Sequence, residues 1–163
     1  GLNEAYRQLR ELLTTFRLRI DGRGLGTAID NTIQEFRRRS GVAIQLDRQL
    51  DGPELPPERE IHVLQIIREA LSNIERHARA TQVRVSLAND GPGHIRVRIE
   101  DDGIGFAQQS PPVNRYGLVI MRDRAESLAG ELQVSPRTGG GTQVELRFPT
   151  LPPTPPARPE GKP

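Results

Sequence analysis

The stretch that decides the fold is REALSNIERHA, residues 68–78. On a helix with about 100° per residue, Glu69, Asn73 and Arg76 fall on one side, and His77 lies at the edge of this group. The opposite side carries an apolar stripe formed by Leu64, Ile67, Leu71, Ile74 and Ala78. An amphipathic helix with a solvated polar face accounts for this pattern by itself. A role in binding or catalysis therefore depends on the residues further along the chain.

The composition indicates one folded domain with an extended C-terminal segment. The chain has 163 residues, enough for one domain with its own core. Seven of its 14 prolines lie within residues 149–163. A segment so rich in proline does not pack as a globular element, and we therefore predict that residues 150–163 form a disordered tail.

Charge and residue usage exclude several classes of function. The net charge is only +2, and the 23 basic residues are spread along the chain without interleaved aromatic residues, which predicts no nucleic-acid binding. The absence of cysteine excludes disulfides, cysteine metal sites and cysteine nucleophiles. Because apolar runs are only a few residues long, we expect no membrane-spanning segment and no membrane contact from this chain.

Hydrophobic periodicity predicts helices that are followed by strands. Helices are expected at residues 2–20, 25–39, 57–78 and 117–128, the last with Gly130 as its C-cap. Strands are expected at residues 42–46, 83–87, 95–99, 132–135 and 142–148. This order predicts an α+β fold, a two-layer sandwich in which a mixed, mainly antiparallel sheet of about five strands is covered by about three helices. The helix at residues 2–20 precedes this sandwich and carries an apolar stripe that needs a partner.

Glycine-rich stretches follow the predicted strands. DDGIGF, residues 101–106, follows one strand directly, and taken alone it is compatible with an ordinary turn. It is neither a dinucleotide fingerprint nor a phosphate-binding Walker loop, since the required third glycine and the GK[ST] sequence are absent. However, a Gly-Leu pair opens a later helix, and GGGT at residues 139–142 precedes the last strand. Ordinary turns do not explain why these stretches and the helix at 68–78 occur in this order.

Together these stretches resemble the ATP-binding domain shared by sensor histidine kinases, gyrase, Hsp90 and MutL. REALSNIERHA resembles the N box of the kinases, EDDGIGF (100–106) the first glycine box, YGLVIMRDRAESLAG (116–130) the second, and GGGTQVELRFP (139–149) the terminal segment. The form of the second box is similar to that of the nitrate/nitrite sensor kinases. QLRELLTTFRLRI, residues 8–20, resembles the end of the dimerisation region of that subgroup.

The resemblance implies a domain organisation and an activity. Residues 22–149 are expected to form the ATP-binding catalytic domain, of the Bergerat type, and residues 1–21 the last helix of the dimerisation region. The intact protein is expected to be a homodimer whose dimerisation helix carries a histidine that accepts the γ-phosphoryl group of ATP. A response-regulator aspartate would receive it next. This family also implies the cytoplasmic portion of a bacterial inner-membrane sensor.

The same resemblance assigns polar side chains to ATP and Mg²⁺. Asn73 supplies its side-chain oxygen to the metal, a type of ligand that suits Mg²⁺. Arg76 contacts phosphate oxygens, and His77 flanks the nucleotide. Asp101 accepts a hydrogen bond from the adenine amino group, which guanine cannot offer at that position. Thr142 shares this network through a water molecule.

Backbone contacts are assigned to the glycine boxes. Gly103 and Gly105 allow the backbone to approach the base. Gly117 and Leu118 open a helix whose N-terminal amides suit a phosphate. Gly141 precedes Thr142 in the terminal segment and belongs to the same set.

The chain departs from the family pattern at two points. Tyr116 occupies the place of the first glycine of the usual Gly-x-Gly in the second box, so its contacts with the nucleotide are expected to differ. The three histidines, His62, His77 and His94, do not lie in the setting that the family uses for its phosphoacceptor. The chain is therefore expected to bind ATP without phosphorylating itself.

Glu69 is the candidate catalytic residue. It precedes Asn73 by one helical turn, and we expect it to act as a polarising base for the accepting group. An ion pair with Arg68 or Arg76 on the helix surface is the structural alternative. For the whole chain, the alternatives are a nucleotide-binding switch without kinase activity and an ATPase or serine kinase of the same superfamily. The short connection at residues 107–114 and the helix at 2–20 favour the kinase.

Overall fold

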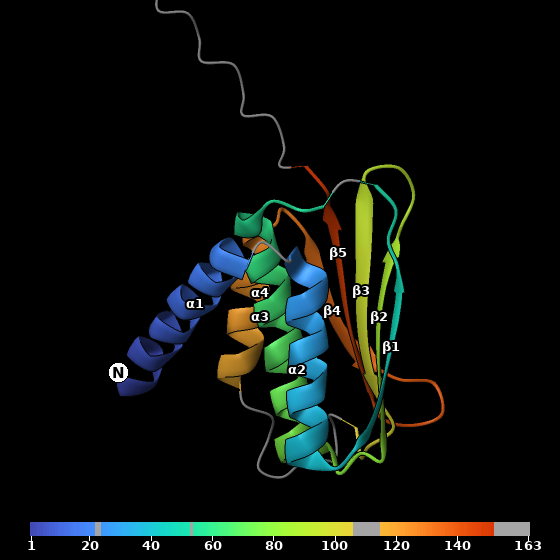
Figure 1. Ribbon diagram of the computed structural model, residues 1–163. Coiled ribbons are helices and arrows are strands. Elements are labelled where there is room, and N and C mark those ends of the chain that lie inside the picture. Colours follow the sequence, from blue (N-terminus) through green and yellow to red (C-terminus); the bar gives the residue numbers. More distant parts are fainter. Residues whose placement is uncertain (22–23, 53, 106–114, 152–163) are drawn as a thin grey trace, which may run out of the picture.

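The computed structural model describes residues 1–21, 24–52, 54–105 and 115–151 (Figure 1). Its α-helices are α1 (Leu2–Asp21), α2 (Gly24–Ser40), α3 (Pro57–Asn73) and α4 (Arg115–Ser127), and a π-helical turn, η1 (Ile74–Ala78), continues α3. Its strands are β1 (Ala43–Gln49), β2 (Gln82–Asn89), β3 (His94–Asp101), β4 (Glu131–Pro136) and β5 (Thr142–Pro149). The helices lie on one side of the sheet, which confirms the predicted two-layer α+β sandwich.

The sheet has five strands in the order β1-β2-β3-β5-β4. Strand β1 is parallel to β2, and the other neighbours are antiparallel, as the prediction of a mixed, mainly antiparallel sheet requires. The parallel pair arises because α3 carries the chain back across the sheet between β1 and β2. In the central pair of β3 and β5, Asp101 lies opposite Thr142. Two predicted site residues from distant parts of the sequence are thus neighbours.

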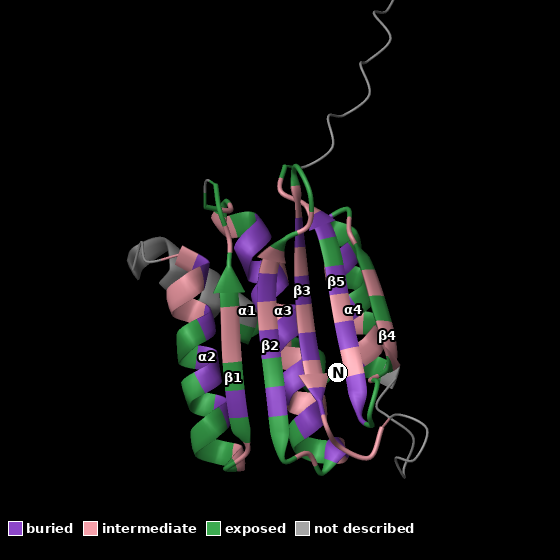
Figure 2. Ribbon diagram, turned by 90° about the vertical axis from the view of Figure 1, so that its right-hand side faces the viewer, coloured by how far each residue is buried: buried purple, intermediate pink, exposed green. Residues whose placement is uncertain are grey.

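Alternation along the strands separates the two faces of the sheet (Figure 2). The face under the helices is mainly apolar, and these inward apolar residues of the three central strands are buried: Val83, Val85, Leu87, Ile95, Val97, Ile99, Val144, Leu146 and Phe148. The outer face is polar and carries ion pairs such as Arg98 to Glu145, with 2.6 Å between Nε and Oε2. The helical layer therefore covers one face only.

Helix α3 is the centre of the helical layer. It packs against α2 on one side and α4 on the other, and it faces the sheet. Leu64, Ile66 and Ile67 have no exposed surface. The buried surface extends to Ile66 and Ala70, beyond the predicted stripe, because α3 has neighbours on three sides.

The predicted helix extends to Ala78 as expected, but its last turn is not a regular α-helix. The α-helix ends at Asn73, residues 74–78 form η1, and Arg79 follows with a left-handed backbone, φ 51°. The wider π turn changes the direction of Arg76 and His77 relative to a regular helix. The carbonyl oxygen of Ala78 then accepts a hydrogen bond from the amide of Ile104, with an N···O distance of 2.8 Å.

Both ends of α4 differ from the prediction. The helix begins at Arg115, two residues before the predicted start at Gly117. Gly130 is not the left-handed C-cap; Ala129 has φ 53°, and the Gly130 amide donates to the Ala125 carbonyl at 2.8 Å. A side chain at Gly130 would place its first carbon 2.7 Å from the Arg147 carbonyl oxygen. Close packing against β5 is thus the reason for glycine there.

Helix α1 presents several of its apolar residues to solvent. Five of them are 54–88% exposed: Leu2, Tyr6, Leu9, Leu12 and Leu13. Within the described ranges, no helix is both long enough and apolar enough to cross a membrane. Residues 22–23, where we placed the boundary of the catalytic domain, and residues 152–163 of the predicted tail lie outside the described residues. These boundaries stay predictions.

We expect Leu64→Ala to lower the free energy of unfolding by about 2–5 kcal/mol, because it leaves a cavity in the core around α3. The matched control is Leu12→Ala on α1, where the side chain is 68% exposed and the expected change is within about 0.5 kcal/mol. Urea unfolding followed by circular dichroism measures both. Equal effects of the two substitutions would contradict the central place of α3.

Candidate nucleotide-binding site

A small cavity lies between the end of α3 and the ends of β3 and β5. Four predicted site residues line it, namely Asn73, Asp101, Leu118 and Thr142. The rest of its lining is apolar: Ala70, Ile74, Ala78, Ile99, Met121 and Val144. Its volume is about 30 Å³, enough for water and far below the roughly 300 Å³ of a ligand pocket. We therefore treat the cavity as the innermost part, or floor, of a candidate site. Residues 106–114, which connect the glycine loop at 101–105 to α4, lie outside the described residues.

Asp101 ends β3 inside the fold and is 4% exposed. Its Oδ1 accepts a hydrogen bond from the Gly103 amide at 2.9 Å. Burial raises the pKa of this carboxyl, and backbone hydrogen bonds from Gly103 and Thr142 offset part of that increase. A buried carboxylate that faces a cavity offers a strong acceptor to a ligand that brings an N–H group.

Thr142 lies opposite Asp101 in the sheet and is 7% exposed. Its hydroxyl oxygen is buried and has no hydrogen-bond partner among the described residues. Such a group is costly to leave unsatisfied, so it marks a place where a water molecule or a ligand completes the structure. The predicted role of Thr142 in the network around Asp101 stays a prediction.

Three glycines allow the backbone to pack tightly around the cavity. A side chain at Gly103 would place its first carbon 2.1 Å from the Ala78 carbonyl oxygen, and one at Gly141 would lie 1.8 Å from the Asp101 carbonyl oxygen. Gly105 and Gly141 also have positive φ angles, 79° and 96°. In the described structure, contacts between backbone segments therefore require glycine at 103 and 141. The predicted approach of the backbone at Gly103 and Gly105 to a nucleotide base stays a prediction.

The first turn of α4 lies against the polar end of α3. A side chain at Gly117 would place its first carbon 3.3 Å from Oε2 of Glu69 and 3.4 Å from the side-chain amide of Asn73. Glycine at 117 thus keeps the space between Glu69, Asn73 and the backbone of α4 free of a further side chain. Glu69, Asn73 and Gly117 come together, as their assignment to one site requires.

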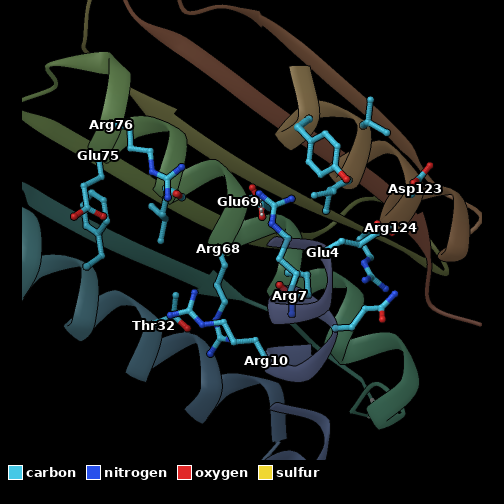
Figure 3. Close-up of a pocket in the computed structure, with 18 of the residues that line it drawn as sticks. Glu4, Arg7, Arg10, Thr32, Arg68, Glu69, Glu75, Arg76, Asp123 and Arg124 are labelled. Carbon is cyan, nitrogen blue, oxygen red and sulfur yellow. Dashed lines mark ion pairs between the residues drawn. The ribbon is translucent and has the colours of Figure 1, made fainter. Parts of the chain in front are cut away.

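Other predicted residues lie in a second, larger groove between α1, α2, α3 and α4 (Figure 3). Its volume is about 1120 Å³, and Glu69, Arg76 and Tyr116 line it. Glu69 is 17% exposed in its side chain, and its Oε1 is 3.6 Å from Nη2 of Arg7. His77 lines neither the groove nor the small cavity. The predicted side chains other than His77 therefore fall into two groups, one that lines the small cavity and one that lines the groove.

The sequence of residues 58–152 matches the family described as "Histidine kinase-, DNA gyrase B-, and HSP90-like ATPase". This match covers more than half of the chain and includes α3, the glycine loop and the whole of β5. The chain belongs to this family. The ATP-binding fold that the sequence motifs predicted is therefore confirmed.

Relatives from this family are sensor proteins. The chain is 42% identical over 147 residues to the nitrate/nitrite sensor protein NarX of Escherichia coli K12, covering 90% of this chain and 24% of that protein. It is 43% identical over 148 residues to NarQ of the same strain, covering 91% and 26%. A solved histidine kinase domain from Erythrobacter litoralis superposes with a TM-score of 0.64 at 28% identity, covering 78% of this chain and 61% of that one. The chain thus spans about a quarter of the length of these two nitrate/nitrite sensor proteins.

The sequence did not point to two sets of residues that line the cavity or the groove, namely the apolar lining of the cavity and Arg7. The apolar residues that line the small cavity include Ile99, Met121 and Val144. They have the spacing of ordinary core residues, so nothing in the sequence distinguishes them from the core. Arg7 comes from α1, more than 60 residues before Glu69, and the local alternatives for an ion pair named only Arg68 and Arg76. Only the tertiary structure brings Arg7 to Glu69.

Asp101 and its neighbour Asp102 are expected to have opposite effects on the pH dependence of stability. The raised pKa of Asp101 means that the folded state binds its proton more tightly, so its contribution to stability falls as pH rises above about 4. Hydrogen bonds from Thr81 and Gln82 lower the pKa of Asp102, so its contribution is lost as pH falls below about 4.

Urea unfolding at a series of pH values tests both signs. Relative to Asp101→Asn, the parent chain should lose stability as pH rises above about 4. Relative to Asp102→Asn, the parent chain should lose stability as pH falls below about 4. Buried Glu60, whose pKa is also raised by desolvation, is present in every protein and cancels in these differences. For each variant, the difference in the free energy of unfolding from the parent chain is plotted against pH. If the two plots have slopes of the same sign, burial does not raise the pKa of Asp101.

Proposed function

We propose that this chain is the ATP-binding catalytic part of a two-component sensor histidine kinase, in the nitrate/nitrite sensor subgroup. The observation that carries this proposal is the pair formed by a buried carboxylate, Asp101, and an unsatisfied buried hydroxyl, Thr142, with Asn73 lining the same cavity. The identity of 42–43% to nitrate/nitrite sensor proteins supports the choice of subgroup.

Adenine fits the polar floor of this site. The Asp101 carboxylate accepts a hydrogen bond from the exocyclic amino group of adenine, whereas guanine presents a carbonyl oxygen there and is rejected. A water molecule between the base and the Thr142 hydroxyl supplies the partner that this hydroxyl lacks. The apolar residues around the cavity, such as Ile99 and Met121, suit the face of the base.

The side chain of Asn73, at the end of α3, offers an oxygen ligand that suits Mg²⁺. Within the described ranges, no three acidic, histidine or cysteine side chains converge on a metal position, so a cage made only of protein ligands is not available there. Mg²⁺ instead takes one or two protein oxygens together with phosphate oxygens and waters, and the Asn73 oxygen supplies such a ligand. When bound, the ion neutralises charge on the triphosphate. The absence of a side chain at Gly117 suits an approach of phosphate oxygens to the N-terminal amides of α4.

Glu69 is placed to act on the group that receives the phosphoryl. It lies one helical turn before Asn73, and both side chains approach the first turn of α4. From this position its carboxylate can accept a proton from, or orient, an attacking imidazole. Positioning and charge neutralisation supply the rest of the catalysis, as is usual in phosphoryl transfer.

The proposed function requires partners that bind other parts of the intact protein. The acceptor is a histidine on a dimerisation helix, because His62, His77 and His94 lie in other settings. The exposed apolar residues of α1, among them Leu9 and Leu12, suit a helical partner in a homodimer. A response-regulator aspartate is the next acceptor, and we place this chain in the cytoplasmic portion of a bacterial inner-membrane sensor.

We expect Asp101→Asn to weaken binding of Mg²⁺-ATP by about 10- to 100-fold, the range that corresponds to the loss of one hydrogen bond to a charged group. Isothermal titration calorimetry measures this change directly. The preference for ATP over GTP should fall at the same time, because the introduced amide can also donate a hydrogen bond to a carbonyl oxygen.

The matched control for this titration is Asp102→Asn. Asp102 is the adjacent acid, but its carboxylate oxygens bind Thr81 and Gln82 and are not part of the cavity lining. Its substitution should change the affinity for ATP by no more than about two-fold. If both variants bind ATP like the parent chain, or if the parent chain does not bind ATP, the proposed function is wrong.

Glu69→Gln should separate nucleotide binding from phosphoryl transfer. We expect the variant to bind Mg²⁺-ATP like the parent chain and to transfer phosphoryl to a separately made helix with the acceptor histidine about 100-fold more slowly, since a positioned base typically contributes 10²- to 10⁴-fold. Radiolabelled ATP measures the transfer. If Glu69→Gln transfers phosphoryl as fast as the parent chain, Glu69 has no catalytic role. If the parent chain binds ATP but transfers no phosphoryl, a nucleotide-dependent switch is favoured over a kinase.

A further inference from the structure

Arg137 lies at the same end of the sheet as Asp101. The pairing of the strands brings the two residues together: Asp101 is opposite Thr142 in β3 and β5, and Thr142 is opposite Pro136 in β5 and β4. Arg137 follows directly and begins the turn that connects β4 to β5 (Figure 1). This turn therefore lies beside the floor of the site, although it is more than 30 residues from Asp101 in the sequence.

Hydrogen bonds within the turn hold both the backbone and the side chain of Arg137. The Arg137 amide donates to the Gly141 carbonyl at 3.0 Å, and the Gly140 amide donates to the Arg137 carbonyl at 3.1 Å. The Nη1 group of Arg137 also donates to the Gly140 carbonyl at 3.2 Å. Gly141 in turn packs on the backbone of Asp101 so closely that no side chain fits between them. The guanidinium is thus fixed to the segment that contacts Asp101.

The charge of Asp101 has few neighbours. Among the described residues that line the cavity, Asp101 is the only charged one, and α3 and α4 contribute uncharged side chains. Burial and the like charge of Asp102 raise the pKa of Asp101, whereas backbone hydrogen bonds from Gly103 and Thr142 and the charge of Arg137 lower it. Of these groups, only Arg137 carries a positive charge. It therefore opposes the effect of Asp102 on the same carboxylate.

We infer that Arg137 is a positioning residue for nucleotide recognition: its guanidinium compensates the buried negative charge of Asp101 and keeps that carboxylate in the form that accepts a hydrogen bond from the adenine amino group. This inference rests on the proposed function and names a further residue of the same site. A carboxyl that takes up a proton loses its charge and becomes a weaker acceptor. Arg137 acts through Asp101 and does not contact the nucleotide.

The pH profile of adenosine binding tests this role, since adenosine carries the base without the phosphates. Arg137→Gln removes the charge and keeps an amide that can donate to the Gly140 carbonyl. Its affinity should match that of the parent chain within about two-fold at about pH 8 and be up to about ten-fold weaker at about pH 5, because a midpoint that moves by about one pH unit corresponds to a factor of about ten. Arg137→Lys keeps the charge and should follow the parent profile. Ligand-observed NMR measures the affinities, and circular dichroism checks folding at each pH.

The same titrations with Mg²⁺-ATP separate this role from a direct contact with phosphate. If Arg137 acts through Asp101, Arg137→Gln lowers the affinities for ATP and adenosine by the same factor at each pH. The matched control is Arg147→Gln, which also removes one positive charge. Arg147 lies near the other end of β5, where its Nε is 2.7 Å from Oδ2 of Asp90. Its loss should leave both profiles unchanged.

A double substitution shows whether the effect passes through Asp101. In the background of Asp101→Asn, which cannot ionise, Arg137→Gln should change the affinity for ATP by no more than about two-fold at any pH. These ATP titrations decide the outcome even where adenosine binds too weakly to measure.

Three results overturn the inference: Arg137→Gln has the pH profile of the parent chain or of Arg147→Gln, it weakens binding of ATP but not of adenosine, or its effect persists in the Asp101→Asn background. Each of them leaves the proposed function intact as long as Asp101→Asn itself weakens ATP binding. If the parent chain does not bind ATP, in contrast, the proposed function is wrong, and the inference with it.

Discussion

The burial of α3 is the constraint on which the rest of the structure depends. The helix is enclosed by the sheet, α2 and α4, and nine of its residues are buried, including the charged Arg59 and Glu60. Arg59 fixes its beginning by donating hydrogen bonds to the carbonyl oxygens of Leu128, at 2.9 Å, and Pro149, at 2.6 Å. These contacts compensate for its burial, which lowers the pKa of its guanidinium. A helix fixed in this way holds Glu69 and Asn73 at a defined place beside the sheet.

Tight backbone packing determines the other half of the site. The carbonyl oxygen of Ala78 ends the π turn and binds the amide of Ile104, while Gly103 passes it without room for a side chain. Gly141 approaches the backbone of Asp101 in the same manner from β5. Because these segments contact each other through backbone atoms, the backbone of Asp101 is fixed between them, and the Gly103 amide holds its carboxylate. The precision of the polar floor thus comes from positions where only glycine fits.

The sequence was sufficient for most of the fold because its local signals agree with the tertiary structure. Alternation placed β2, β3 and β5, and the order of elements predicted a mixed sheet under helices.

The π turn at residues 74–78 was not predictable, since it depends on the contact between Ala78 and Ile104 and not on local periodicity. The left-handed Ala129 was missed for a similar reason: the adjacent Gly130 is needed for packing against β5, although glycine usually marks the left-handed residue itself. Motifs identified Asn73, Asp101 and Thr142, whereas Arg7 has no signal because its partners lie on other helices.

The two sides of α1 differ in the strength of the contacts that they can make. Burying an exposed leucine such as Leu9 or Leu12 against a helical partner contributes roughly 1.5–3 kcal/mol each. A partly exposed ion pair such as that of Arg7 with Glu69 contributes about 0–1 kcal/mol. A partner helix that covers these leucines would therefore add more stability than the ion pair between α1 and α3 does.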